Sequence, residues 1–445
     1  MKNYIVVVGG GLAGCEAAYQ IAKQGIKVKL YEMKPQKFSP AHSNQDLAEI
    51  VCSNSLKSNL LTNACGLLKE ELRRLDSLLI RCADETAVPA GQALAVDREK
   101  FSKLVTQKIE ENPNIEIIHE EYTKMEEDVI TIIATGPLTS EKLSEKIKKL
   151  TGEDDLYFYD AAAPIIEKDS INMKIAFLGD RYSEEKKKGE TIEEWKKRLL
   201  KEEKNYLNLP MNQEQYETFV NELLKAEVVQ LHSFEKREIF EGCMPIEIMA
   251  SRGIDTLRFG PLKPVGFDDP RTGRRPYAVV QLRQDNESGT LFNMVGFQTN
   301  LKFGEQKRVF SKIPGLEKAE FIKYGVMHRN TYLNSTKLLD RTYQMRDNPN
   351  LYFAGQITGV EGYVESISSG LVAGMNAANQ FQRKDKKVFS EETVIGALAD
   401  YISTPNEKFQ PMNANFGILP PLEERIKDKK LRYQTLANRS LDYFK

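Results

Sequence analysis

The feature that most constrains this chain is a glycine-rich turn between a strand and a helix near its amino terminus. Residues 5–8 read Ile-Val-Val-Val, which is typical of a buried parallel strand, and the glycine-rich turn follows at once. The segment from Cys15 to Ala22 has the composition of a helix. Its helix dipole would be directed at a bound phosphate. The residues that we predict to contact the cofactor in this turn are Gly9, Gly10, Gly11, Leu12, Ala13 and Gly14.

Each glycine of this turn has a separate physical reason to be glycine. Gly9 permits the tight turn, Gly11 allows the backbone to approach a pyrophosphate, and Gly14 allows close helix-strand packing. A second strand-like segment, residues 27–31, ends at Glu32, which lies at the distance expected for an acid that binds a ribose hydroxyl. The pattern therefore predicts a βαβ unit that binds a dinucleotide.

Two distant segments favour FAD over NAD as that dinucleotide. Residues 128–133 form a buried-strand pattern that ends at Ala134, Thr135 and Gly136. This turn resembles the alanine-threonine-glycine turn of flavoproteins with a glutathione-reductase-like fold. Residues 350–354 resemble the late strand of those proteins, whose closing glycine would be Gly355, followed by Gln356. A helix is expected over residues 369–378, with its amino terminus directed at the flavin ring.

These segments come together only if a second domain interrupts the first. We therefore predict an α/β fold: a glutathione-reductase-like Rossmann FAD-binding domain, discontinuous in sequence, from residues 1–150 and 331–445. An inserted α+β domain, residues 151–330, would bind the substrate or RNA.

Composition narrows the class of protein. The chain of 445 residues is 41% hydrophobic and 29% charged, and it has no apolar run of about 18 residues that could span a membrane. Five cysteines without a Cys-x-x-Cys pair, and four histidines, argue against a disulfide framework and a metal site. We expect a soluble, cytoplasmic protein. Its net charge of −1 means that nucleic-acid binding would depend on local basic patches.

Six further segments resemble one family in particular, the folate- and FAD-dependent tRNA uracil-5-methyltransferases. They occur in order over nearly the whole chain: residues 48–59 (AEIVCSNSLKSN), 88–98 (VPAGQALAVDR), 240–247 (FEGCMPIE), 325–331 (GVMHRNT), 359–366 (GVEGYVES) and 410–417 (QPMNANFG).

The resemblance implies a route to ribothymidine that does not use S-adenosylmethionine. Methylenetetrahydrofolate would give its one-carbon unit to reduced FAD, and the flavin would pass it to carbon 5 of a uridine in RNA. NADH or NADPH would supply the electrons. The expected RNA is tRNA, methylated at its T-loop uridine, with ribosomal RNA as an alternative target. No obligate protein partner is evident.

This chemistry needs a nucleophile that adds to carbon 6 of uracil and a base that removes the proton from carbon 5. By resemblance, Cys243 is the nucleophile and Cys52 is the acid or base, and the reverse assignment is open. Spacing alone would favour a buried packing role for either thiol. Such a packing role is the expectation for Cys15, Cys65 and Cys82.

Other segments suggest contacts with flavin or RNA. The resemblance places residues 359–365 in a loop on the flavin, with Gly362 and Tyr363 as contacts and Tyr363 as a stacking ring. Basic segments at residues 271–277 and 425–433 could contact phosphates or could be solvated surface. The pair His328 and Arg329 has no assigned role. A charge-dense segment, residues 183–204, is interpreted as containing an exposed helix from Thr191 to Lys204.

Other activities are compatible with parts of the sequence. One is the related, longer flavoprotein that modifies the wobble uridine of tRNA, and the segments around Cys52 and Cys243 count against it. Another is an NAD(P)H-dependent flavin oxidoreductase without an RNA substrate, although we find no second glycine fingerprint for a nicotinamide. A third is an RNA folding aid with a structural flavin. Methylation from S-adenosylmethionine would not explain residues 134–136 and 354–355.

Overall fold

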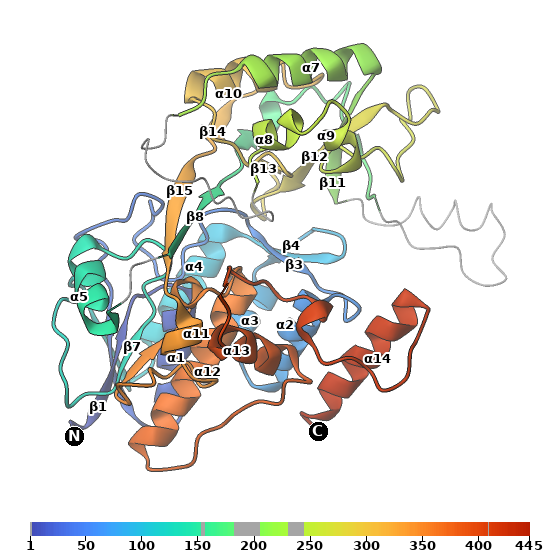
Figure 1. The fold of residues 1–445 in the computed structure, drawn as a ribbon. Helices are drawn as coiled ribbons and strands as arrows, with labels where there is room; N and C mark the ends of the chain where they lie inside the picture. Colours follow the sequence, from blue (N-terminus) through green and yellow to red (C-terminus); the bar gives the residue numbers. More distant parts are fainter. Residues whose placement is uncertain (1, 153–155, 182–204, 230–243, 408) are drawn as a thin grey trace. The chain divides into compact units, whose positions relative to one another are not determined.

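The structure is a computed structural model that describes residues 2–152, 156–181, 205–229, 244–407 and 409–445. The chain divides into two compact units. The first comprises residues 1–87, 92–158 and 329–445, and the second comprises residues 88–91 and 159–328. Both units are drawn in Figure 1. The predicted charged helix in residues 183–204 lies outside the described residues.

The first unit contains a five-stranded parallel sheet in the order β16-β7-β1-β2-β6. Its strands are β1 (Tyr4–Val8), β2 (Lys27–Tyr31), β6 (Ile115–Ile118), β7 (Thr131–Ile133) and β16 (Leu351–Phe353). The middle strand β1 is almost wholly buried because its run of Ile and Val is covered on both faces. Strands from both ends of the sequence therefore form one sheet, which confirms the predicted discontinuous fold.

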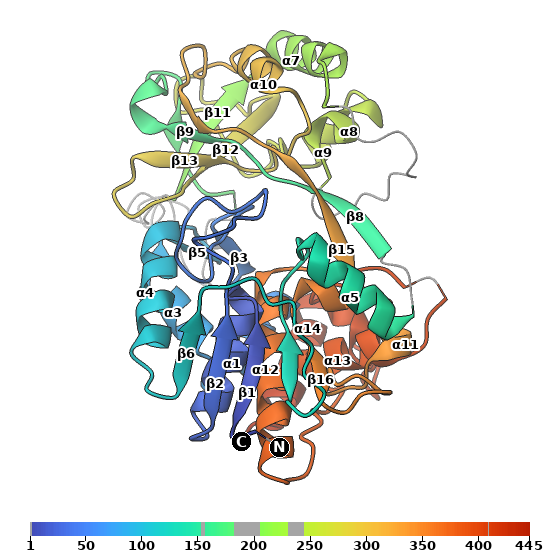
Figure 2. The same cartoon turned by 90° about the vertical axis from the view of Figure 1, so that its left-hand side faces the viewer.

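Helices surround this sheet (Figure 2). They are α1 (Leu12–Ala22), α2 (Ala64–Arg74), α3 (Leu78–Glu85), α4 (Arg98–Glu110), α5 (Glu141–Thr151), α11 (Ser335–Leu338), α12 (Tyr363–Phe381), α13 (Val394–Ser403) and α14 (Lys429–Asp442). Helices α1 and α12 cross closely because glycines face the backbone of the partner helix. A Cβ added at Gly370 would lie 2.2 Å from the carbonyl oxygen of Ala13, and one at Gly374 would lie 2.7 Å from that of Ala17.

Three short strands form a second sheet in the order β3-β5-β4, comprising β3 (Ser55–Ser58), β5 (Ala93–Val96) and β4 (Ala87–Val88). Strands β8 (Leu156–Ala161) and β15 (Met327–Tyr332) form a two-stranded sheet. Single 3-10 turns occur at η1 (Lys168–Ser170), η3 (Gln356–Thr358) and η4 (Phe416–Ile418).

The second unit contains a six-stranded antiparallel sheet in the order β10-β11-β12-β13-β9-β14. Its strands are β9 (Ile165–Glu167), β10 (Phe177–Leu178), β11 (Tyr206–Met211), β12 (Ala278–Gln284), β13 (Leu291–Met294) and β14 (Phe321–Lys323). Its helices are α7 (Gln213–Lys225), α8 (Ile246–Ser251), α9 (Thr256–Phe259) and α10 (Phe303–Phe310). Apolar side chains of the sheet and of these helices form one buried core, which includes Leu209, Phe219 and Phe310. This mixture of sheet and helix is the predicted α+β insert class.

Among the described residues, no helix combines the length and the apolar composition that a membrane span requires. Within the same residues, no group of three or more His, Cys, Asp or Glu side chains is arranged to hold a metal ion.

Candidate cofactor site and cysteine loop

The predicted cofactor segments lie side by side because they follow neighbouring parallel strands. The amide of Ala134 donates to the carbonyl oxygen of Val8 at 2.8 Å, and the amide of Ala354 donates to that of Ile133 at 2.9 Å. The glycine turn after β1, residues 134–136 after β7 and Gly355 after β16 are therefore at one edge of the sheet. The carboxyl edge of a parallel sheet is where such folds bind ligands.

The glycine turn is shaped by contacts that a side chain would prevent. Gly9 has a φ of +103°, and an added Cβ would lie 2.6 Å from the carbonyl oxygen of Ala134. At Gly14 an added Cβ would lie 1.8 Å from the carbonyl oxygen of Gly9. At Gly11, by contrast, the described residues place no atom within 4 Å of an added Cβ. Gly14 therefore meets protein, whereas Gly11 borders open space.

The start of α1 suits an anion. Gly11 is the N-cap residue, no side chain caps the helix, and its first turn, which includes Leu12 and Ala13, contains no acidic residue. The first amide groups of an α-helix lack partners within the helix, and a bound phosphate can accept their hydrogen bonds. The open space beside Gly11 and the uncapped helix start therefore fit a pyrophosphate.

Glu32 is held rigidly at the end of β2. It is 8% exposed, and its two carboxylate oxygens accept hydrogen bonds from the amides of Gly10 at 2.8 Å and Lys34 at 2.9 Å. Each oxygen retains lone-pair capacity for a ribose hydroxyl. The carboxylate of Glu32 can therefore accept a further hydrogen bond, and its role as ribose ligand stays a prediction.

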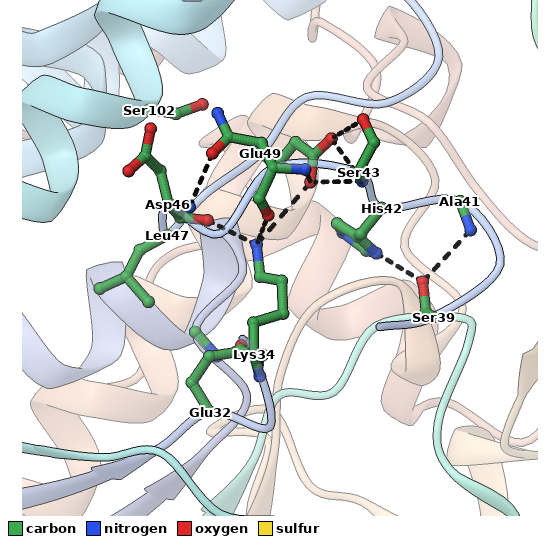
Figure 3. A network of polar contacts seen from close by, with 12 residues as sticks. Glu32, Lys34, Ser39, Ala41, His42, Ser43, Asp46, Leu47, Glu49 and Ser102 are labelled. Atoms are coloured by element: carbon green, nitrogen blue, oxygen red, sulfur yellow. Dashed lines mark hydrogen bonds and ion pairs between the residues drawn. The ribbon is translucent and has the colours of Figure 1, made fainter. Parts of the chain in front are cut away.

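A network of polar contacts extends from this point along residues 34–49 (Figure 3). The ammonium group of Lys34, which is almost fully buried, donates to the carbonyl oxygens of Asn44 and Asp46 and lies 3.8 Å from Glu49. Glu49 in turn accepts the amides of Ser43 and Asn44. Sequence reasoning missed Lys34 and Glu49, because single charged residues in a loop carry no pattern.

The remaining predicted cofactor residues follow β7 and β16. The amide of Gly355 donates to Ser369 Oγ at 2.7 Å, and an added Cβ there would lie 3.0 Å from the Cβ of Ala13. The Gln356 side chain donates to Glu361. Thr135 Oγ1 lies 2.6 Å from Thr139 Oγ1, and Gly136, with a φ of +65°, borders open space.

The expected loop at residues 359–365 is wrong in part. Gly362 has a φ of +127° and is the N-cap of α12, so Tyr363 is the first residue of a 19-residue helix. The hydrophobic periodicity that predicted a helix at residues 369–378 continues weakly at residues 363–368, which contain two serines and a glutamate, and so its true start was missed. The hydroxyl of Tyr363 accepts hydrogen bonds from the amides of Cys52 at 2.8 Å and Ser53 at 3.2 Å.

The described cysteines fall into two groups. Cys15, Cys65 and Cys82 are at most 3% exposed, which confirms the expected packing role. Burial raises the pKa of the Cys65 thiol to about 11 and that of the Cys82 thiol to about 12, so both are protonated at neutral pH. Cys52 is partly exposed and lies in the loop before β3. Cys243 lies outside the described residues.

The basic segments at residues 271–277 and 425–433 differ in which cations are exposed and which form ion pairs. In the first, Arg271 forms a bidentate ion pair with Asp269, at 2.9 and 2.7 Å, whereas Arg274 and Arg275 are exposed. The ring of Tyr277 is covered by the guanidinium of Arg258, whose carbon lies 3.6 Å from the ring centroid. This tyrosine is therefore committed to packing within its own unit.

The second basic segment leads into α14. Arg425, Lys427, Lys429 and Lys430 are exposed, and within the part of the chain that the structure describes none of them forms an ion pair. Tyr433 stacks on Phe416 with ring centroids 4.4 Å apart. This segment combines unpaired cations with an aromatic pair.

The parallel sheet of the first unit and the antiparallel sheet of the second together define the fold class. A parallel Rossmann sheet with an antiparallel inserted sheet is the architecture of FAD-dependent oxidoreductase-like proteins. The solved structure of Aquifex aeolicus GidA matches it with a TM-score of 0.69 at 16% identity, covering 99% of this chain and 73% of that one.

Sequence comparison identifies the family within that class. The family model described as glucose inhibited division protein A matches residues 4–385. Methylenetetrahydrofolate--tRNA-(uracil-5-)-methyltransferase TrmFO of Halalkalibacterium halodurans is 59% identical over 99% of this chain and 97% of its own. The protein of the same name from Acetivibrio thermocellus is 58% identical over 100% of this chain and 98% of its own. The chain belongs to this TrmFO family, which confirms the resemblance found in the sequence.

Proposed function

We propose that this protein methylates carbon 5 of a uridine in tRNA, with 5,10-methylenetetrahydrofolate as the one-carbon donor and NADH or NADPH as the reductant. The observation that carries the proposal is identity of 58–59% to TrmFO proteins over essentially the full chain, including both cysteine segments. The T-loop uridine is the proposed target. The cytoplasm, where tRNA and reduced folate are available, is the proposed location.

FAD, when bound, would carry the one-carbon unit and the reducing electrons between folate and uracil. The glycine turn and the start of α1 would hold its pyrophosphate, and Glu32 would bind its ribose. Residues 134–136, Gly355 and Gln356 would line the same edge, with Gly362 and Tyr363 nearer the flavin ring. The uncapped helix start and the open space at Gly11 support this placement.

The two cysteines would have different roles in the reaction at uracil. Cys243 would add to carbon 6 and make carbon 5 nucleophilic, and Cys52 would accept the carbon 5 proton after methyl transfer. Cys15, Cys65 and Cys82 are buried, whereas Cys52 is partly exposed. This difference supports Cys52 as the cysteine of the first unit that acts on the substrate. The inserted domain, residues 151–330, would contribute substrate and RNA contacts.

Two groups of cations are the proposed phosphate contacts. Arg274 and Arg275 in the second unit are exposed, and Arg425, Lys427, Lys429 and Lys430 add exposed cations in the first unit. Because the net charge of the whole chain is −1, these local groups would have to supply the attraction to RNA.

The test is transfer of labelled carbon from methylenetetrahydrofolate to unmodified tRNA and ribosomal RNA by the purified flavoprotein with NADPH. We expect label in the T-loop uridine of tRNA and its loss in Cys52→Ala and Cys243→Ala. Cys82→Ala is the matched control, since that thiol is buried and protonated.

Other outcomes separate the alternatives. Label in ribosomal RNA alone would keep the chemistry and change the target. Rapid NADPH oxidation with no label in either RNA would leave a flavin oxidoreductase. Full activity of the flavin-free protein with S-adenosylmethionine would overturn the proposed cofactor.

A further inference from the structure

The backbone around Cys52 is held from several sides. Before it, the amide of Ala48 donates to the carbonyl oxygen of Gly10 at 2.9 Å, so this loop is attached to the cofactor turn itself. After it, the buried Asn54 exchanges hydrogen bonds with Val96 through its backbone carbonyl and its side-chain amide, at 2.9 and 3.1 Å. Cys52, which lies between these anchors, is a partly exposed residue. The loop is therefore fixed while its cysteine stays reachable.

Arg98 anchors the residues immediately before the cysteine. Its guanidinium donates to the carbonyl oxygens of Ile50 at 3.1 Å and Val51 at 3.3 Å. Arg98 is the first residue of α4, so the anchor is set on a helix. The guanidinium is also close enough to Tyr363 to favour the ionised phenol, which offsets part of the effect of burial.

Tyr363 anchors Cys52 and Ser53 themselves. One phenol oxygen accepts both of their amides, and these residues are separated from Tyr363 by 311 and 310 positions in sequence. Burial, and secondarily the neighbouring Cys52, raises the pKa of the phenol, so the hydroxyl stays neutral at physiological pH. A neutral hydroxyl has two acceptor lone pairs, and the two amides occupy both.

We propose that Tyr363 is a positioning residue for Cys52: its hydroxyl, assisted by Arg98, fixes the cysteine loop against the first turn of α12. This inference rests on the proposed function for its effect on turnover. It goes beyond a stacking role for the ring, because the hydrogen bonds use only the oxygen. A displaced thiol would be costly, since a shift of about 1 Å in a reacting group can cost a hundredfold in rate.

Tyr363→Phe isolates the oxygen because it leaves the ring in place. We expect FAD content to stay near one per chain and kcat to fall at least tenfold, with KM for folate changing much less. Tyr19→Phe is the matched control, because that hydroxyl accepts from Arg81 at the surface. Arg98→Ala removes the Nη1 donor that contacts both carbonyl oxygens, and a double variant with Tyr363→Phe should lose less kcat than the product of the single effects.

Two readouts do not depend on methylation. Iodoacetamide should alkylate Cys52 several-fold faster in Tyr363→Phe than in the parent or Tyr19→Phe, as followed by peptide mass spectrometry. Amide hydrogen exchange at Cys52 and Ser53 should be slow in the parent and fast in the variant.

Unchanged alkylation and exchange in a folded Tyr363→Phe would overturn the positioning role. Fast hydrogen exchange at the amides of Cys52 and Ser53 in the parent protein would also overturn the positioning role. This measurement needs no variant. If the parent transfers no label to RNA but alkylation and exchange respond as expected, the proposed function fails and the positioning of Cys52 stands.

Discussion

At the scale of single residues, two glycines of the cofactor turn should respond to the same substitution in different ways. Gly14→Ala places a methyl group against the Gly9 carbonyl, so we expect a marked fall in unfolding temperature even without flavin. Gly11→Ala meets no protein atom, so the flavin-free protein should keep its unfolding temperature while FAD affinity falls at least tenfold. Thermal unfolding of flavin-free protein and FAD titration measure the two effects, with Gly304→Ala as control. Equal unfolding temperatures for Gly11→Ala and Gly14→Ala would contradict the conclusion that only Gly14 packs against protein.

At the scale of elements, the side chain of Glu71 connects helices α2, α13 and α14 by hydrogen bonds. It is fully buried on α2, and its carboxylate accepts the amides of Val394 and Ile395 at the start of α13 and the hydroxyl of Ser440 on α14. Glu71→Gln replaces one accepting oxygen by a donor that faces these groups, so we expect a loss of about 1–3 kcal/mol in unfolding free energy. Chemical denaturation measures it, and Glu99→Gln on the exposed surface of α4 is the control.

The same carboxyl predicts a pH dependence. Burial raises the pKa of Glu71 to about 7, although its three hydrogen bonds oppose the rise. The folded state then binds this proton more tightly than the unfolded state, whose pKa is near 4.5. Its contribution to stability is therefore fully present below that value and is lost as pH rises towards 7. The difference in unfolding free energy between parent and Glu71→Gln should change across this window, and a constant difference would exclude the raised pKa.

At the scale of the whole molecule, the proposed binding of tRNA, a polyanion, would have to occur on a chain whose net charge is −1. RNA affinity should therefore depend on few cations and fall with salt. Replacing Arg274 and Arg275 by Ser should weaken tRNA binding and reduce the slope of log K against log salt by up to about 2. Filter binding across a salt series measures this slope. Replacing Arg383 and Lys384, two exposed cations after α12, is the control, and an equal effect there would argue for diffuse attraction.

Local patterns were sufficient for the fold class and the cofactor turn. A glycine turn between strand and helix, followed by a strand that ends in an acid, is encoded within about 30 residues, because each step depends on backbone geometry and neighbouring side chains. Strands β7 and β16 were predictable for the same reason, because each is a short apolar run that ends at a glycine-containing turn. The start of α12 was missed, since Gly362 and the polar residues after Tyr363 interrupt the hydrophobic period that marks a helix.

The sequence by itself determined the parallel sheet and the glycine turn, and it predicted Glu32 and, through family resemblance, the two cysteines as site residues. Only the tertiary structure decided what holds the Cys52 loop: Gly10, Arg98 and Tyr363, which come from separate elements of the first unit. It also decided that Arg271 is paired within its own loop whereas Arg274 is exposed. The physical reason is range. Hydrophobic period and turn chemistry act between near neighbours, whereas a hydrogen bond between residues 311 positions apart exists only after the sheet has brought them together.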